Sequence, residues 1–244
     1  MDNTLLIYSL IIFIAAVFGG ILPLLRKWSD ELLHMFISFG AGIFIATVFF
    51  HLLPEALADE HAEVASYFIL GGFLFVFFIE KFLFSRGGDA GYDHGHHVIS
   101  ITAFLGLSIH SVIAGLGLAV SSNFKIIEEL IFYSIIAHKT TAAFSLVTLF
   151  LLARQPIKRI LMYLFVFSLM TPVGAVVLGS VMRLGHGIAL DAMLGLTAGT
   201  FLYVAVGELL PEVFHTKANR FRKMILMLLG ILLVVVIGLM GHGH

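Results

Sequence analysis

Long apolar runs separated by short polar stretches cover almost the whole chain. Residues 4–25, 98–124 and 160–182 contain no Asp, Glu, Lys or Arg. A helix that crosses a membrane needs about 20 mostly apolar residues, whereas the strands of a membrane barrel alternate apolar and polar positions. The pattern therefore predicts an all-α integral membrane protein with eight transmembrane helices, over residues 4–25, 33–53, 66–84, 98–121, 129–152, 160–182, 189–209 and 223–241.

The composition agrees with this pattern. Of the 244 residues, 60% are hydrophobic and only 12% are charged, against about 25% charged residues in a typical soluble domain. A water-soluble globular domain is therefore excluded. The net charge of −1 gives no basic field for nucleic acid, and the absence of cysteine excludes thiolate metal sites and cysteine nucleophiles. We expect the lipid bilayer and small ions as partners, and no nucleic acid.

Basic residues are divided unevenly between the loops. Of the 14 Lys and Arg residues, eleven lie in the first, third, fifth and seventh loops or at the span ends that border them (Lys81 and Lys223), two lie in the even loops, and Lys139 lies within the fifth span. Loops on the cytoplasmic side carry an excess of Lys and Arg. We therefore expect a multi-pass protein of the cell membrane, with the odd loops in the cytoplasm and both termini outside.

The sequence Leu-Leu-Pro-Glu occurs twice, over residues 52–55 at the end of the second span and over residues 209–212 at the end of the seventh. In the expected orientation, the first copy lies at the outer face and the second at the inner face. Equal motifs on opposite faces are what an inverted repeat leaves, and secondary transporters are often built from such repeats. A match of four residues in a leucine-rich chain can also arise by chance.

Ionisable side chains inside a bilayer are costly and usually functional. Two lines of small or polar residues follow helical spacing and contain the two deep histidines: His110, Ala114, Gly117 and Ser121 in the fourth span, and Ser134, His138, Thr141 and Ser145 in the fifth. Two neutral imidazoles in one polar seam suit Zn²⁺, Fe²⁺, Ni²⁺ or Cu²⁺. Close helix packing with a hydrogen-bonded histidine is the alternative interpretation.

Further histidines and carboxylates lie near the ends of two spans. His51 and Glu55 share a helix face at the outer end of the second span, where they could offer a nitrogen and a carboxylate to an arriving cation. Glu208, Glu212 and His215 lie toward the inner end of the seventh span and could form an exit site. Ordinary solvated helix ends are the alternative in both places.

The third loop is rich in histidine. Residues 85–97 are rich in glycine and contain Asp89, Asp93, His94, His96 and His97. Such a cytoplasmic cluster fits a low-affinity metal store or sensor, and a flexible solvated linker is the alternative. We expect this loop to be part of a single transmembrane domain that covers residues 1–244.

Taken together, these residues resemble the ZIP (Zrt/Irt-like protein) family of divalent metal transporters. The resemblance rests on eight spans, the histidine-bearing third loop, and four segments in order: Ser108–Gly115, Ala137–Leu146, Thr171–Gly174 and Ala198–Glu212. It implies a 3+2+3 bundle whose outer triplets are inverted repeats and whose fourth and fifth helices carry the metal site.

The resemblance also implies roles for single residues. His110, Ser111 and His138 fall on metal-site positions of the family, and Glu208 and His215 match its inner exit region. The stretch from Asp93 to His97 matches the family's cytoplasmic histidine loop.

The chain departs from the family pattern where many members carry carboxylates. Ala114 stands four residues after the histidine of the fourth span, Ala142 stands where many members have a second carboxylate, and Thr171 stands where some have glutamate. Lys139 falls where many members have an acidic ligand and some have lysine. We therefore expect a site for one metal ion at most, with the Lys139 ammonium in the space of the second.

Charge also counts against a standard site. A protonated Lys139 with no carboxylate beside it repels a divalent cation strongly in a medium of low dielectric constant. Lys139 must therefore lose its proton, or pair with Glu55, Glu80 or Glu208, unless the site differs from the family norm.

Three functional hypotheses follow. The first is a transporter, not an enzyme, that moves Zn²⁺ or a similar divalent cation into the cytoplasm by alternating access, with the metal as substrate rather than cofactor. The second is a transport-deficient ZIP-fold metal-binding sensor or regulator, motivated by the missing carboxylates. The third is an intramembrane metal-dependent hydrolase, which needs a third ligand and a general base that the fourth and fifth spans do not offer. The sequence leaves open the metal, the coupling ion and whether the chain forms a homodimer.

Overall fold

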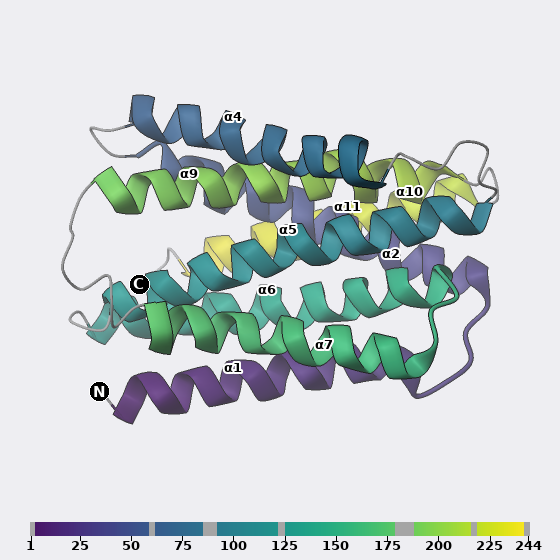
Figure 1. Ribbon diagram of the computed structural model, residues 1–244, viewed down its shortest axis with the longest axis horizontal. Helices are drawn as coiled ribbons and strands as arrows, with labels where there is room; N and C mark the ends of the chain where they lie inside the picture. Colours follow the sequence, from purple (N-terminus) through teal and green to yellow (C-terminus); the bar gives the residue numbers. More distant parts are fainter. Residues whose placement is uncertain are drawn as a thin grey trace. The chain divides into compact units, whose positions relative to one another are not determined.

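The computed structural model describes residues 3–58, 62–84, 92–121, 125–178, 188–215 and 219–241, and it builds them from helices joined by short turns (Figure 1). These ranges contain no strand. Seven helices within them are long and apolar enough to cross a membrane. The expected all-α membrane fold is therefore confirmed.

The seven candidate spans correspond to the first seven predicted from the sequence. They cover Asn3–Leu24, Asp30–Ala56, Ala62–Phe82, Ile99–Ala119, Ile131–Leu152, Ile157–Val177 and Leu194–Phe214. The eighth predicted span coincides with α11 (Arg220–Gly241), a helix of 22 residues that is not among the seven. The total of eight transmembrane helices stays a prediction.

The chain divides into two compact units, and unit 1 comprises Met1–Lys27 and Gly91–Leu190. Its elements are α1 (Asn3–Ile21), the 3₁₀ turn η1 (Leu22–Leu24), α5 (Tyr92–Ser121), α6 (Lys125–Leu152), α7 (Ile157–Pro172) and the π-helical segment η4 (Val173–Leu178). The helices α1 and α5 each pack against both α6 and α7 (Figure 1). The fourth and fifth predicted spans, which carry the two deep histidines, are therefore direct neighbours.

Unit 2 comprises Trp28–Ala90 and Asp191–His244. Its elements are α2 (Asp30–Thr47), η2 (Val48–Leu52), α3 (Leu53–Ala56), α4 (Ala62–Phe78), η3 (Ile79–Phe84), α9 (Ile188–Leu202), η5 (Tyr203–Leu209), α10 (Leu210–His215) and α11, of which η2, η3 and η5 are π-helical. The helix α2 begins after the cap Ser29, whose side chain accepts a hydrogen bond from the Leu32 N–H, and it packs against α11 and α10.

Glycines allow the helices of unit 2 to touch at the backbone. A Cβ atom added at Gly72 of α4 would collide with the Leu196 carbonyl of α9, and one at Gly230 of α11 would collide with the Phe39 carbonyl of α2. Between helices in a membrane there is little hydrophobic driving force, so close backbone packing at small residues supplies much of the association. These two crossings pair α4 with α9 and α2 with α11.

Each Leu-Leu-Pro-Glu motif begins at the end of a π-helical segment. Leu52 ends η2 just before Pro54, and Leu209 ends η5 just before Pro211. Proline has no N–H and its ring clashes with the carbonyl four residues earlier, so it interrupts the α-helical hydrogen-bond pattern, and a π-helical turn takes up the change. The two motifs therefore share a local structure as well as a sequence, and the inverted repeat stays a prediction.

The histidine-rich loop is shorter than the sequence predicted. The helix α5 begins at Tyr92, so the backbone at His94, His96 and His97 is helical rather than part of a loop. Hydropathy marks the part of a helix that suits the bilayer, and a helix can continue past that point into polar surroundings. The side chains of these three histidines lie outside the described residues.

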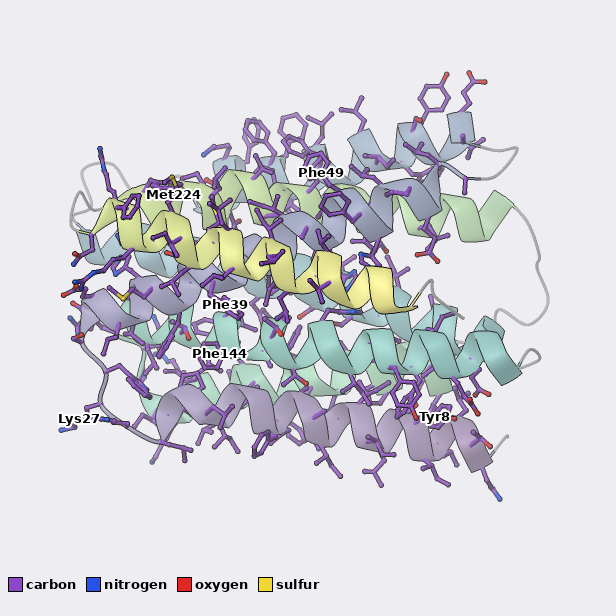
Figure 2. The ribbon with its side chains drawn as sticks, turned by 180° about the vertical axis from the view of Figure 1, so that it is seen from behind. Tyr8, Lys27, Phe39, Phe49, Phe144 and Met224 are labelled. Carbon is purple, nitrogen blue, oxygen red and sulfur yellow. The ribbon has the colours of Figure 1, made fainter. Side chains whose placement is uncertain are left out.

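Large apolar side chains remain exposed on both units, among them Phe18, Phe165, Phe49 and Met224; Figure 2 labels the last two, which belong to unit 2. Exposed apolar surface on this scale marks an interface or a membrane contact. It agrees with a chain whose surface meets lipid tails.

Two adjacent glycines of α4 provide a test of the backbone contact with α9. We expect Gly72→Ala to destabilise the protein by about 1–3 kcal/mol, because the added methyl group collides with the backbone of α9. Gly71→Ala is the matched control, since nothing lies within 4 Å of a Cβ atom at Gly71. Thermal unfolding in detergent measures both, and equal midpoints for the two variants would contradict the packing described here.

Candidate metal site

The two deep histidines meet between α5 and α6. Nε2 of His110 lies 3.3 Å from Nε2 of His138, with ring centroids 5.2 Å apart, and His110 is only 4% exposed. Two ligands of a tetrahedral Zn²⁺ ion at about 2.0–2.1 Å are separated by about 3.3–3.4 Å. The imidazole pair therefore has the ligand type and the separation that such an ion requires.

Close backbone packing brings these side chains together. A Cβ atom at Gly115 would collide with the Thr171 carbonyl, and one at Gly174 would collide with the Val112 carbonyl, so α5 and α7 touch just after His110. A Cβ atom at Gly19 of α1 would collide with the Thr140 carbonyl of α6 in the same way, two residues after His138. The histidine pair thus lies close in sequence to two close helix crossings of unit 1, α5 with α7 and α1 with α6.

Hydroxyl groups near the pair differ in what they bind. The Ser111 hydroxyl donates to the Leu107 carbonyl at 2.6 Å, which leaves its oxygen lone pairs as the part that could reach an ion. The Ser145 hydroxyl is buried and has no hydrogen-bond partner in the part of the chain that the structure describes. The side chain of Ser134 is outside that part.

Ala114 and Ala142, the alanines that the resemblance placed at carboxylate positions, take part in packing. Ala114 contacts the apolar cluster of unit 1 that contains Leu5, Leu118 and Ile135, and Ala142 is 2% exposed. Neither can supply an oxygen. Among the described residues, no group of three or more His, Cys, Asp or Glu side chains is arranged to hold a metal ion.

The Lys139 side chain reaches α7. Its ammonium donates to the Phe167 carbonyl at 2.9 Å and lies 3.7 Å from the centre of the Phe167 ring, and the side chain is 1% exposed. A carbonyl dipole and an aromatic face can both stabilise a desolvated cation. From the sequence we expected neighbouring carbonyls, hydroxyls or a glutamate as partners of this ammonium, but the sequence did not identify the carbonyl and ring of Phe167.

The remaining predicted site residues belong to unit 2. Glu208 lies in η5 and Glu212 in α10, and both are 2% exposed. His51 lies in η2 and Glu55 in α3, while His215 ends α10 with its side chain outside the described residues. Because the units are described separately, a ligand role for Glu208 beside the histidine pair stays a prediction.

Two contacts of unit 2 were missed by the sequence analysis. Glu80 accepts hydrogen bonds from the Tyr203 hydroxyl and, at 2.6 Å, from the Lys81 ammonium, so this carboxylate already has partners. His34 contacts Glu212 at 3.2 Å. His34 could have been singled out from the sequence, because it is an ionisable residue just inside the second predicted span. Its position at the edge of that span suggested a solvated side chain rather than a buried one.

Comparison with known proteins decides the family. The model of the ZIP zinc transporter family matches residues 3–89 and 85–238. The chain belongs to the ZIP zinc transporter family. It is 25% identical to zinc transporter ZIP1 of Takifugu rubripes, over 95% of each chain. It is also 27% identical to zinc transporter ZIP9 of Xenopus tropicalis over 99% of each chain, and 25% identical to human zinc transporter ZIP2 over 79% of this chain and 84% of that one.

Family membership confirms the resemblance drawn from the sequence. ZIP proteins are transporters rather than enzymes, so the hydrolase hypothesis is set aside, and zinc is their transported substrate rather than a cofactor.

The histidine pair predicts the effect of two substitutions. We expect His110→Ala and His138→Ala each to abolish metal flux, because the lost nitrogen has no replacement in a buried seam. His96→Ala is the control and should change flux only modestly, since His94 and His97 are its neighbours in the sequence. Uptake is measured in proteoliposomes at equal protein content, and wild-type flux in both seam variants would favour simple helix packing.

Proposed function

We propose that this protein moves a divalent metal cation, with Zn²⁺ as the expected ion, into the cytoplasm by alternating access. The observation that carries the proposal is the part-buried pair of imidazole nitrogens 3.3 Å apart on neighbouring helices of a ZIP-family chain. Imidazole is a borderline ligand that suits Zn²⁺ and several other transition metals. Relatives named zinc transporters support zinc within that group.

The core site takes one metal ion at most. His110 and His138 provide two nitrogens, Ser111 provides an oxygen, and Glu208 is the carboxylate proposed to join them. The apolar side chains of Ala114 and Ala142 leave a second ion without ligands. When it is protonated, Lys139 provides a positive charge near the pair, which lowers affinity and favours release of the ion over tight binding.

The path of the ion follows the polar residues at the two faces. His51 and Glu55 form the outer opening, and Glu212 and His215 lie at the inner end with the histidines of residues 94–97. The charge asymmetry of the loops supports this direction, with both termini outside and the odd loops in the cytoplasm.

A transport-deficient metal sensor or regulator is the second candidate. It is favoured by the alanines at positions 114 and 142 and by the absence of a three-ligand cluster among the described residues. Such a protein would bind metal at the histidine pair without moving it across the bilayer.

Uptake into proteoliposomes over a panel of divalent metals tests the proposal. Saturable Zn²⁺ uptake that requires His110 and His138 supports a transporter. Binding of Zn²⁺ to the purified protein without uptake of any metal of the panel would instead establish the sensor.

A substitution of Lys139 tests its proposed role. We expect Lys139→Met to raise metal affinity, because it keeps much of the side-chain length and removes the charge. The pH dependence of binding should become shallower, since one group that can release a proton on metal binding is lost. Binding to the purified protein is measured across pH, and Lys81→Met is the control, because Lys81 is a half-exposed lysine near the ring of another phenylalanine, Phe77. Unchanged affinity and pH slope, or two metal ions bound at α5 and α6 in the wild type, would rule this role out.

Cysteine labelling tests the orientation. The chain has no cysteine, so a single Cys introduced at position 96 has no background thiol. We expect it to resist a membrane-impermeant reagent in intact cells and to react after permeabilisation. Labelling in intact cells would reverse the proposed topology.

A further inference from the structure

The end of unit 1 where α6 stops and α7 begins carries an excess of positive charge. Lys158 and Arg159 are exposed in the first turn of α7. Lys27, labelled in Figure 2, is exposed just beyond η1, which packs against α6. Among the side chains that the structure describes in unit 1, the carboxylates are those of Glu128 and Glu129, near the start of α6. They lie roughly 35 Å away along that helix, so this end attracts anions.

The dipole of α7 adds to this charge. The N-terminus of a helix carries a partial positive charge, so polar caps and acidic side chains are favourable there and cations are unfavourable. The helix α7 begins after Pro156, which provides no side-chain cap, and its first turn contains no acidic residue. The helix α2 shows the favourable arrangement, in which the cap Ser29 is followed by Asp30 and Glu31. An anion from outside the chain would supply the negative charge that the start of α7 lacks.

Exposed apolar side chains lie beside these cations. Ile157, Leu161 and Phe165 follow one face of α7 at a spacing of four residues, and they are 61%, 44% and 53% exposed. The helix α1 is next to this face, because the Phe165 ring meets the Phe13 ring of α1 edge to face, with centroids 5.9 Å apart. Leu25, at the same end of unit 1, is 71% exposed. These exposed residues of α7 and Leu25 form an apolar strip that begins at the cations.

We propose that this end of unit 1 binds an anionic phospholipid. The phosphate meets Lys158, Arg159 and the N-terminus of α7, and an acyl chain lies along the apolar strip. A small soluble anion would use the cations but leave the strip uncovered, and a zwitterionic lipid brings an ammonium group of its own to a place that is already positive. In the proposed orientation this end faces the cytoplasmic leaflet, whose anionic lipids attract basic segments at the membrane surface.

A second basic helix start, in unit 2, provides the matched control. Arg220 and Arg222 are exposed in the first turn of α11. Lys223 of the same turn interacts electrostatically with the carboxylates of Glu31 and Glu212. Acidic residues therefore offset the positive charge at the start of α11, whereas the start of α7 has no acidic residue of its own. The two helix starts carry similar cations and differ in their need for an external anion.

Thermal unfolding of the purified full-length protein in detergent tests the proposal. A ligand that binds the folded state raises the thermal midpoint, and the midpoint is followed while phosphatidylglycerol or phosphatidylcholine is added. We expect phosphatidylglycerol to raise it more. The double variant Lys158→Gln/Arg159→Gln should bind phosphatidylglycerol about 10-fold or more weakly, because each cation near an anionic lipid contributes roughly 5-fold in affinity.

The control variant Arg220→Gln/Arg222→Gln should keep the full preference for phosphatidylglycerol. All four substituted side chains are exposed, so both variants are expected to fold. The preference is the difference between two lipids acting on the same variant, and a change in basal stability therefore cancels.

Three results overturn the lipid site. Equal effects of the two lipids on the wild type would leave the cations with a role in orientation alone. A preference that survives in the α7 variant, or that falls equally in both variants, would make it a general attraction to the basic face. A rise produced by glycerol 3-phosphate that matches the rise with phosphatidylglycerol would show an anion site that needs no acyl chain.

Discussion

A polar side chain inside a bilayer must find its partner within the protein, because lipid offers none, and this constraint governs the structure. His110 and His138 meet each other, Lys139 meets a carbonyl and a ring on α7, and His34 meets a carbonyl and a carboxylate. These contacts require helices that approach at backbone distance. Glycine at the crossings provides that approach, so the small residues of unit 1 are as necessary to its site as the imidazoles.

The same constraint bears on Ala114 and Ala142, where the resemblance led us to expect carboxylates in many family members. A carboxylate at position 114 or 142 would be buried among apolar neighbours, where it is stable only beside a cation. With alanine at both positions no second ion is needed for charge balance. The Phe167 carbonyl and ring stabilise the Lys139 ammonium locally.

The spans and the histidine pair could be predicted from the sequence because each leaves a recognisable pattern along the chain. Apolar runs set seven of the helices within a few residues, and helical spacing placed His110 and His138 on polar faces. The predicted start of this helix at residue 98 was wrong, because α5 begins at Tyr92. Hydropathy does not show where a helix ends outside the bilayer. The partners of Lys139 and His34 were missed because backbone carbonyls exist at every residue, and only the fold selects the one that a side chain reaches.

Helix pairing within each unit follows the order that an inverted repeat would require. If the first three spans correspond to the last three, α1 matches α7, α2 matches α9 and α4 matches α11, while α5 matches α6. The close crossings then form equivalent pairs: α1 with α6 and α7 with α5 in unit 1, and α2 with α11 and α9 with α4 in unit 2. The motif with its π-helical segment also falls on equivalent helices, α2 and α9. This pairing of helices is what an inverted repeat predicts beyond the motif of four residues, and the repeat itself stays a prediction.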